Sequence, residues 1–191
     1  MLLRCSCVLL LLALVNLPLL AQETPVVEVF GGYSYNNFDY ASTNMNGWNT
    51  AISWNANRWL SFVADFSGHY SGDRFTVTIP PDPPIKFRTH RAQHTFLFGP
   101  RFSFRQDKRF TPFLHGLFGV GRFRLDTSPG VFDIHRTGLG VSLGGGVDVN
   151  VNSRLAVRVV QADLQILRTD IISPHNFRYS AGLVFRFGRQ K

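Results

Sequence analysis

The last part of the chain, residues 177–187, alternates between apolar and polar side chains at every second position. One face is almost entirely aromatic or aliphatic: Phe177, Tyr179, Ala181, Leu183, Phe185 and Phe187. The opposite face is mostly polar or small: Arg178, Ser180, Gly182, Val184 and Arg186. A period of two is typical of a β-strand with one apolar side. Because a terminal strand leaves backbone groups unpaired, the pattern predicts partner strands elsewhere in the chain.

Seven earlier stretches show the same alternation. They are residues 26–36, 47–55, 59–71, 91–104, 110–125, 138–149 and 155–167. In the last of these the apolar phase changes: Val157 and Val159 share a face, but further along that face continues with Ala162 and Leu164. A change of phase within one strand requires an extra residue, so we predict a β-bulge near Val160.

The connections between these stretches alternate in length. Three are short, at residues 55–58, 105–109 and 150–154. Four are longer, at residues 37–46, 72–90, 126–137 and 168–175. Short turns at one end and long loops at the other are typical of an up-and-down transmembrane barrel. The prediction is an all-β, eight-stranded antiparallel barrel in which the first and last strands pair, which removes both edges.

The polar faces carry few charges, and these are balanced in sign. Together with one histidine, we predict that they form a charge network in the lumen: Glu28, Asp65, Arg101, His115, Asp148, Arg158, Asp163, Arg178 and Arg186. The remaining polar-face positions are mostly Gly, Ser, Asn and Thr, which suits a narrow, crowded interior. An unpaired charge would be costly in such a place, so the balance favours mutual pairing.

Aromatic residues on the apolar faces gather near the two ends of the strands. The predicted girdles are Tyr33, Tyr35, Trp48, Tyr70, Phe177 and Tyr179 at the long-loop end, and Trp54, Phe102, Phe104, Phe110, Phe185 and Phe187 at the short-turn end. Two aromatic bands are typical of a barrel whose apolar face meets lipid at two interfaces. A secreted, soluble ligand-binding barrel, with these aromatics in its core, is the less favoured alternative.

The first 21 residues have the features of a secretory signal. A short basic start is followed by the apolar run Val8–Val15 and by a small residue before Gln22. We therefore expect residues 1–21 to be a cleaved signal peptide and residues 22–191 to form one barrel domain. Cys5 and Cys7 would leave with the signal, so the mature chain would hold neither a disulfide nor a reactive thiol. The net charge of +8 does not indicate a nucleic-acid partner, because the expected signal peptide directs the protein out of the cytoplasm.

The chain resembles the small outer-membrane barrels of the OmpA/OmpX type in its signal segment, its eight strands, its short turns and a closing strand that ends in Phe187. The resemblance implies a protein in the outer membrane of a Gram-negative-type bacterium, with both termini in the periplasm. The oligomeric state stays open, with a monomer expected. The resemblance also implies contact with outer-membrane lipid and recognition of the C-terminal strand by the barrel-assembly machinery. The implied role is structural or surface contact, such as membrane integrity, adhesion or ligand contact through extracellular loops, without a wide pore.

An enzyme that modifies outer-membrane lipid is the second interpretation. His69 and Ser71 have the His-x-Ser spacing of lipid A deacylases, in which a base reaches a nucleophile on one strand face. By alternation both side chains point to the lumen, and no carboxylate is placed on the lipid-facing surface to orient the histidine. The expectation is therefore a non-enzymatic protein with no catalytic residue, no metal site and no cofactor.

Overall fold

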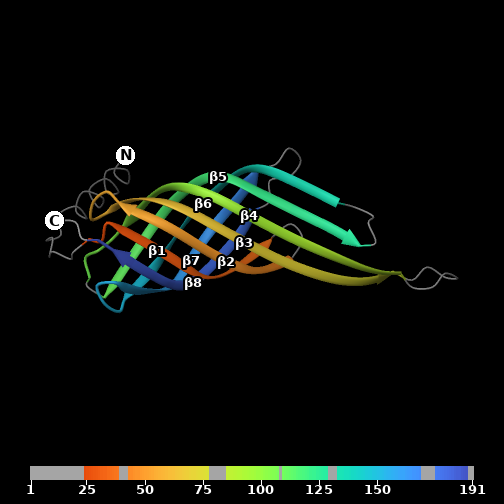
Figure 1. Ribbon diagram of the computed structural model, residues 1–191. Helices are drawn as coiled ribbons and strands as arrows, with labels where there is room; N and C mark the ends of the chain where they lie inside the picture. Colours follow the sequence, from red (N-terminus) through yellow and green to blue (C-terminus); the bar gives the residue numbers. More distant parts are fainter. Residues whose placement is uncertain are drawn as a thin grey trace, which may run out of the picture.

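The computed structural model describes residues 24–38, 43–77, 85–107, 109–128, 133–168 and 175–188. They form eight strands: β1 Val27–Phe38, β2 Thr43–Asn55, β3 Leu60–Val77, β4 Ile85–Ser103, β5 Phe110–Ser128, β6 Asp133–Asn150, β7 Leu155–Arg168 and β8 His175–Phe187. Each strand pairs with its neighbour in chain order, and the sheet closes into a barrel (Figure 1). The predicted antiparallel eight-stranded barrel is confirmed. No helix among the described residues is long and apolar enough to cross a membrane.

The closing strand finds its partner at the other end of the chain. β8 pairs with β1 from Val27 opposite Phe187 to Phe38 opposite Asn176. Beyond the ladder, the backbone N–H of Val26 donates to the carbonyl oxygen of Phe187 at 3.0 Å. The unpaired groups that a terminal strand would expose are thus satisfied within the molecule.

The three short turns share one local device. Asn57 Oδ1 accepts from the backbone N–H groups of Trp59 and Leu60 at 2.9 and 2.8 Å. Asn152 Oδ1 accepts in the same way, at 2.8 Å from each of the N–H groups two and three residues further on. Asp107 accepts from the corresponding N–H groups in the third turn. A short side-chain acceptor that holds its own backbone explains how these connections reverse direction in so few residues.

The bulge in β7 is confirmed. Val159 and Val160 are adjacent, yet both are exposed, at 53% and 46% of their surface. The pairing of β7 with β8 shifts register between Arg158 and Gln161, and that of β6 with β7 shifts between Val147 and Asp148. The extra residue returns the apolar side chains of the rest of β7 to the outer face.

Six strands, β1–β6, are longer at the long-loop end than the alternation of outward apolar residues predicts. Parts of three expected loops belong to strands instead: 37–38, 43–46, 72–77, 85–90, 126–128 and 133–137 continue β1, β2, β3, β4, β5 and β6. The proline-rich centre of the expected loop, residues 80–84, lies outside the described residues. The prediction failed here because the alternation continues with its faces exchanged: apolar side chains move to the inward-facing positions and polar side chains to the outward-facing ones.

We call the extension of β3–β6 the flange: residues 71–77, 85–91, 121–128 and 133–138. In the described structure, β2 pairs with β3 only as far as Tyr70, and β7 pairs with β6 only as far as Leu139. The flange is therefore an open four-stranded sheet that continues beyond the closed ring, at the end opposite the short turns (Figure 1).

The two faces of the flange reverse the chemistry of the barrel wall. Its outer face carries exposed basic side chains: Arg74, Lys86, Arg88, Arg122 and Arg124. Its inner face carries the half-buried Phe87, Phe123 and Leu125, with Ile134 beside them. Below the flange the same strands carry large apolar side chains outside, and the charged groups Asp65, Arg101 and Asp148 lie inside. The inversion marks the height at which the outer surface passes from apolar to polar surroundings.

Candidate functional site

The barrel interior contains a charge network that runs most of its length. All nine residues assigned to the lumen lie inside the barrel, and none exposes more than 7% of its surface: Glu28, Asp65, Arg101, His115, Asp148, Arg158, Asp163, Arg178 and Arg186. They come from β1, β3, β4, β5, β6, β7 and β8. Strand alternation aims them all at the axis, where they meet as two clusters.

The cluster nearer the short turns is centred on Glu28. Its carboxylate accepts from Arg105 and Arg186 at 3.1 Å each, and its second oxygen lies 3.3 Å from Arg101. Arg101 also reaches Asp148 at 3.2 Å. Asp148 in turn accepts from Arg158 Nε at 2.8 Å. Two carboxylates and four guanidiniums thus form one chain of ion pairs away from water, where each charge depends on its partners.

The cluster nearer the flange is centred on Arg178. Its guanidinium binds Asp65 at 2.7 Å and Asp163 at 2.7 Å, so it bridges β3 and β7 across the lumen. Gln161 joins the two clusters: its amide oxygen accepts from Arg158 at 2.7 Å, and its amide nitrogen donates to Asp163 at 2.8 Å. The interior is therefore cross-linked from wall to wall.

The bond between His115 and Asp163 passes over a glycine. His115 on β5 and Asp163 on β7 are both paired with Gly144 of β6, which lies between them. His115 Nε2 donates to Asp163 Oδ1 at 2.7 Å. A β-carbon at Gly144 would lie 2.0 Å from that carboxylate oxygen and 2.5 Å from the backbone oxygen of Ala162. Only glycine leaves room for the two side chains to meet across the middle strand.

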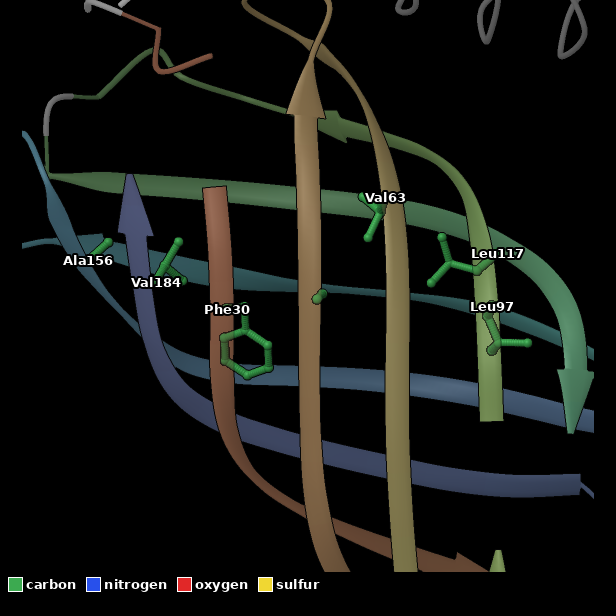
Figure 2. Packing of buried hydrophobic residues seen from close by; sticks show 7 residues of the cluster. Phe30, Val63, Leu97, Leu117, Ala156 and Val184 are labelled. Atoms are coloured by element: carbon green, nitrogen blue, oxygen red, sulfur yellow. The ribbon is translucent and has the colours of Figure 1, made fainter. Parts of the chain in front are cut away.

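Aromatic and aliphatic side chains fill the space around the charges. The guanidinium of Arg101 lies 4.2 Å from the ring centre of Phe113, and Arg158 lies 4.2 Å from that of Phe30. Phe30 belongs to a buried apolar cluster with Val63, Leu97 and Val184, whose side chains point into the barrel from different strands (Figure 2). The interior is a packed mixture of ion pairs and hydrocarbon, and the protein has no wide pore.

Sequence reasoning missed two members of the network, Gln161 and Arg105, and one outward aromatic residue. Arg105, which we assigned to a short turn, is 6% exposed and bound to Glu28. Trp59, also beside a turn, is 55% exposed and stacks on Phe102 with ring centres 5.8 Å apart. The signal for Arg105 was its phase, since it continues the inward row of Arg101 and Ser103 past the end of β4.

The predicted girdle residues all lie on the outer surface. Tyr35 is half-buried, and the other eleven are exposed: Tyr33, Trp48, Trp54, Tyr70, Phe102, Phe104, Phe110, Phe177, Tyr179, Phe185 and Phe187. At the flange end, Tyr33 bonds to Asn46, and Tyr70 Oη lies 2.9 Å from His94 Nε2. Amphipathic side chains with hydrogen-bonded polar ends suit a boundary between hydrocarbon and water.

The pair considered for lipid chemistry is not arranged for it. His69 is fully buried inside the barrel, and its Nε2 lies 2.9 Å from the hydroxyl of Ser34 on β1. Ser71 belongs to the inward row of β3, so neither residue faces the outer surface. Among the described residues, no group of three or more His, Cys, Asp or Glu is placed to hold a metal ion.

A hollow of about 330 Å³ lies at the base of the flange. It is formed by three strands: Tyr70, Ser71 and Gly72 from β3, His90, Arg91 and Ala92 from β4, and Asp126 from β5. Gly72, His90 and Asp126 are direct cross-strand neighbours. Two of the lining carboxylate and guanidinium groups are already paired, Asp126 with Arg124 at 3.1 Å and Arg91 with Asp73.

A closed barrel with an apolar outer band, a packed interior of ion pairs and hydrocarbon, and an open extension is a transmembrane β-barrel. The family described as outer membrane protein beta-barrel domain matches residues 7–187. The chain belongs to this family, and it is an outer-membrane protein.

Solved structures share the fold at low sequence identity. Ail, the attachment invasion locus protein of Yersinia pestis, solved in complex with the heparin analogue sucrose octasulfate, is 17% identical; the match covers 86% of this chain and 100% of that one, with a TM-score of 0.55. Neisserial surface protein A is 15% identical; the match covers 84% and 96% of the two chains, with a TM-score of 0.56. A comparison with curated proteins finds no match.

Proposed function

We propose that the protein is a surface-contact barrel that holds its flange outside the cell, with the short turns and both chain termini in the periplasm. The single observation that carries this is the open flange, in which β3–β6 continue as a sheet beyond the ring that the other strands close. Transmembrane barrels of this class have short periplasmic turns and longer extracellular segments, which supports the orientation.

The flange offers two kinds of contact. Residues 71–77 of β3 and 133–138 of β6 are edge segments in the described structure, so one row of backbone groups on each is open to a partner strand. Its outer face adds exposed arginines, which suit an anionic partner. The names of the two fold neighbours describe attachment and the cell surface for those proteins, in keeping with such a role.

Transport and catalysis have less support. Arg178 crosses the lumen and binds Asp65 on one wall and Asp163 on another. These ion pairs occupy the space that an open pore would need. His69 is turned away from lipid and bound to Ser34. A lipid-modifying enzyme would need its nucleophile and base on the surface that meets its substrate.

Attachment of whole cells tests the proposal. In the test variant, residues 74–88 are replaced by Asn-Gly; Asp73 and Thr89 are cross-strand partners, so a two-residue turn closes the shortened hairpin in register. Gram-negative host cells that produce the full protein should attach to cultured epithelial cells, and those that produce the variant should attach no better than cells without it. A heat-dependent gel shift checks that both barrels fold. Equal attachment by a folded variant would contradict the role of the flange.

A further inference from the structure

The hollow at the base of the flange is made by two small residues among large ones. Gly72 and Ala92 lie diagonally on the outer face: Ala92 is opposite Tyr70, and Gly72 is opposite His90, two residues nearer the flange tip. The imidazole lies over Gly72, where an added β-carbon would be 3.5 Å from His90 Nδ1. A volume of about 330 Å³ is at the lower end of the range of small-molecule sites. The hollow is thus large enough for one polar group with part of its attached molecule.

Two arginines lie directly beyond the hollow, and the described residues provide neither with an acidic partner. Arg74 and Arg88 are cross-strand partners on the outer face, and both are exposed. Within the described ranges, neither forms an ion pair with an acidic side chain; the nearby Asp73 and Asp126 are bound to Arg91 and Arg124. Like charges directly opposite each other destabilise a sheet. An anion held between the two guanidiniums would remove that repulsion, and phosphate matches their geometry.

The height of the site above the aromatic girdle indicates what carries the anion. Gly72 and Arg74 follow the girdle residue Tyr70 by two and four positions on the outer face. In a tilted strand these steps raise them by roughly 5 and roughly 10 Å. The polar headgroup layer is roughly 5–8 Å thick on each side of a bilayer. The hollow and the arginine pair therefore lie at the level of the headgroups and just above it.

We propose that Arg74, Arg88, His90 and the hollow over Gly72 bind a phosphate-bearing headgroup of an outer-leaflet lipid. The two guanidiniums hold the phosphate, and the adjacent part of the headgroup enters the hollow against Tyr70, where His90 provides a hydrogen bond. The site deepens the proposed surface role and rests on it in one respect, since the flange must stand in the outer leaflet.

Titration of the purified full-length protein in neutral detergent with short-chain phosphatidic acid tests the site, with short-chain phosphatidylcholine and inorganic phosphate as comparison ligands. The wild type should bind phosphatidic acid at least tenfold more tightly than either. The R74Q/R88Q variant should lose about tenfold or more of that affinity, since both charge-assisted bonds to the phosphate are removed. Gly72→Val, which fills the hollow at unchanged charge, should also weaken binding several-fold.

Arg136→Gln is the matched control, because Arg136 lies on the inner face of the flange opposite Phe123, and it should leave binding unchanged. Equal effects of R136Q and R74Q/R88Q, or no effect of G72V, would overturn the site. Inorganic phosphate that binds as tightly as the lipid would overturn the headgroup as its ligand. Detergent titration depends neither on orientation nor on cell attachment, so its failure and the failure of the surface role are separate results.

Discussion

The same four strands, β3–β6, carry opposite patterns in the barrel wall and in the flange. In the wall, Phe66 and Phe96 lie outside, and their rings are 4.6 Å apart, while Asp65 lies inside. In the flange, Arg88 lies outside and Phe87 faces inward. Each strand is continuous through both regions, so the alternation itself shows only that a strand is present. The face that carries the apolar side chains shows whether the surroundings at that height are apolar or polar.

Arginine shows the difference most clearly. Arg178 in the wall is fully buried and held by two carboxylates, whereas Arg88 in the flange is exposed and has no acidic partner among the described residues. Removing a buried partner leaves charges stranded in a low dielectric, but removing an exposed one leaves only water in its place. Equal substitutions in the two regions should therefore have very different effects.

The largest expected effect is that of Arg178→Ala, which leaves Asp65 and Asp163 without their shared cation. We expect a loss of about 3–5 kcal/mol in the free energy of unfolding, measured by urea titration in detergent. The control Arg88→Ala should change it by less than about 0.5 kcal/mol. Similar values for the two variants would mean that the interior network does not distinguish the wall from the flange.

A smaller effect is expected from Gly144→Ala, in which the new methyl group meets the Asp163 carboxylate and the backbone of Ala162. Overpacking of this kind costs about 1–3 kcal/mol. The matched control is Gly31→Ala on the outer face of β1, where nothing lies within 4 Å of an added β-carbon. If both variants unfold at the wild-type urea concentration, the contact between His115 and Asp163 does not need the glycine.

Much of the fold follows from period-two alternation alone, including the eight strands, the closing pair β1–β8 and the bulge beside Val160. Alternation also carries the information on which side chains point inward, since a strand offers only two faces. It has no information on how far the ladder extends once the surroundings change. The flange was missed for that reason, because many of its outward residues are basic and its apolar residues, such as Phe87, Phe123 and Leu125, face inward.

The pairing inside the lumen lies beyond sequence reasoning for a related reason. Arg178 and Asp65 are 113 residues apart, and their contact depends on the curvature that brings β3 and β8 face to face across the barrel. Arg105 joins Glu28 because the inward row of β4 continues into a stretch that composition marks as a short turn. Such contacts depend on closure, which no local pattern contains.

In the proposed topology the flange is extracellular and the short turns are periplasmic. Thr76, in the flange, and Ser153, in a short turn, are both exposed, so single cysteines at these positions can be compared directly. A membrane-impermeant maleimide applied to intact cells should label Thr76→Cys and leave Ser153→Cys unlabelled until the outer membrane is permeabilised, with the parent chain as the background control. Labelling of Ser153→Cys but not Thr76→Cys on intact cells would contradict the account.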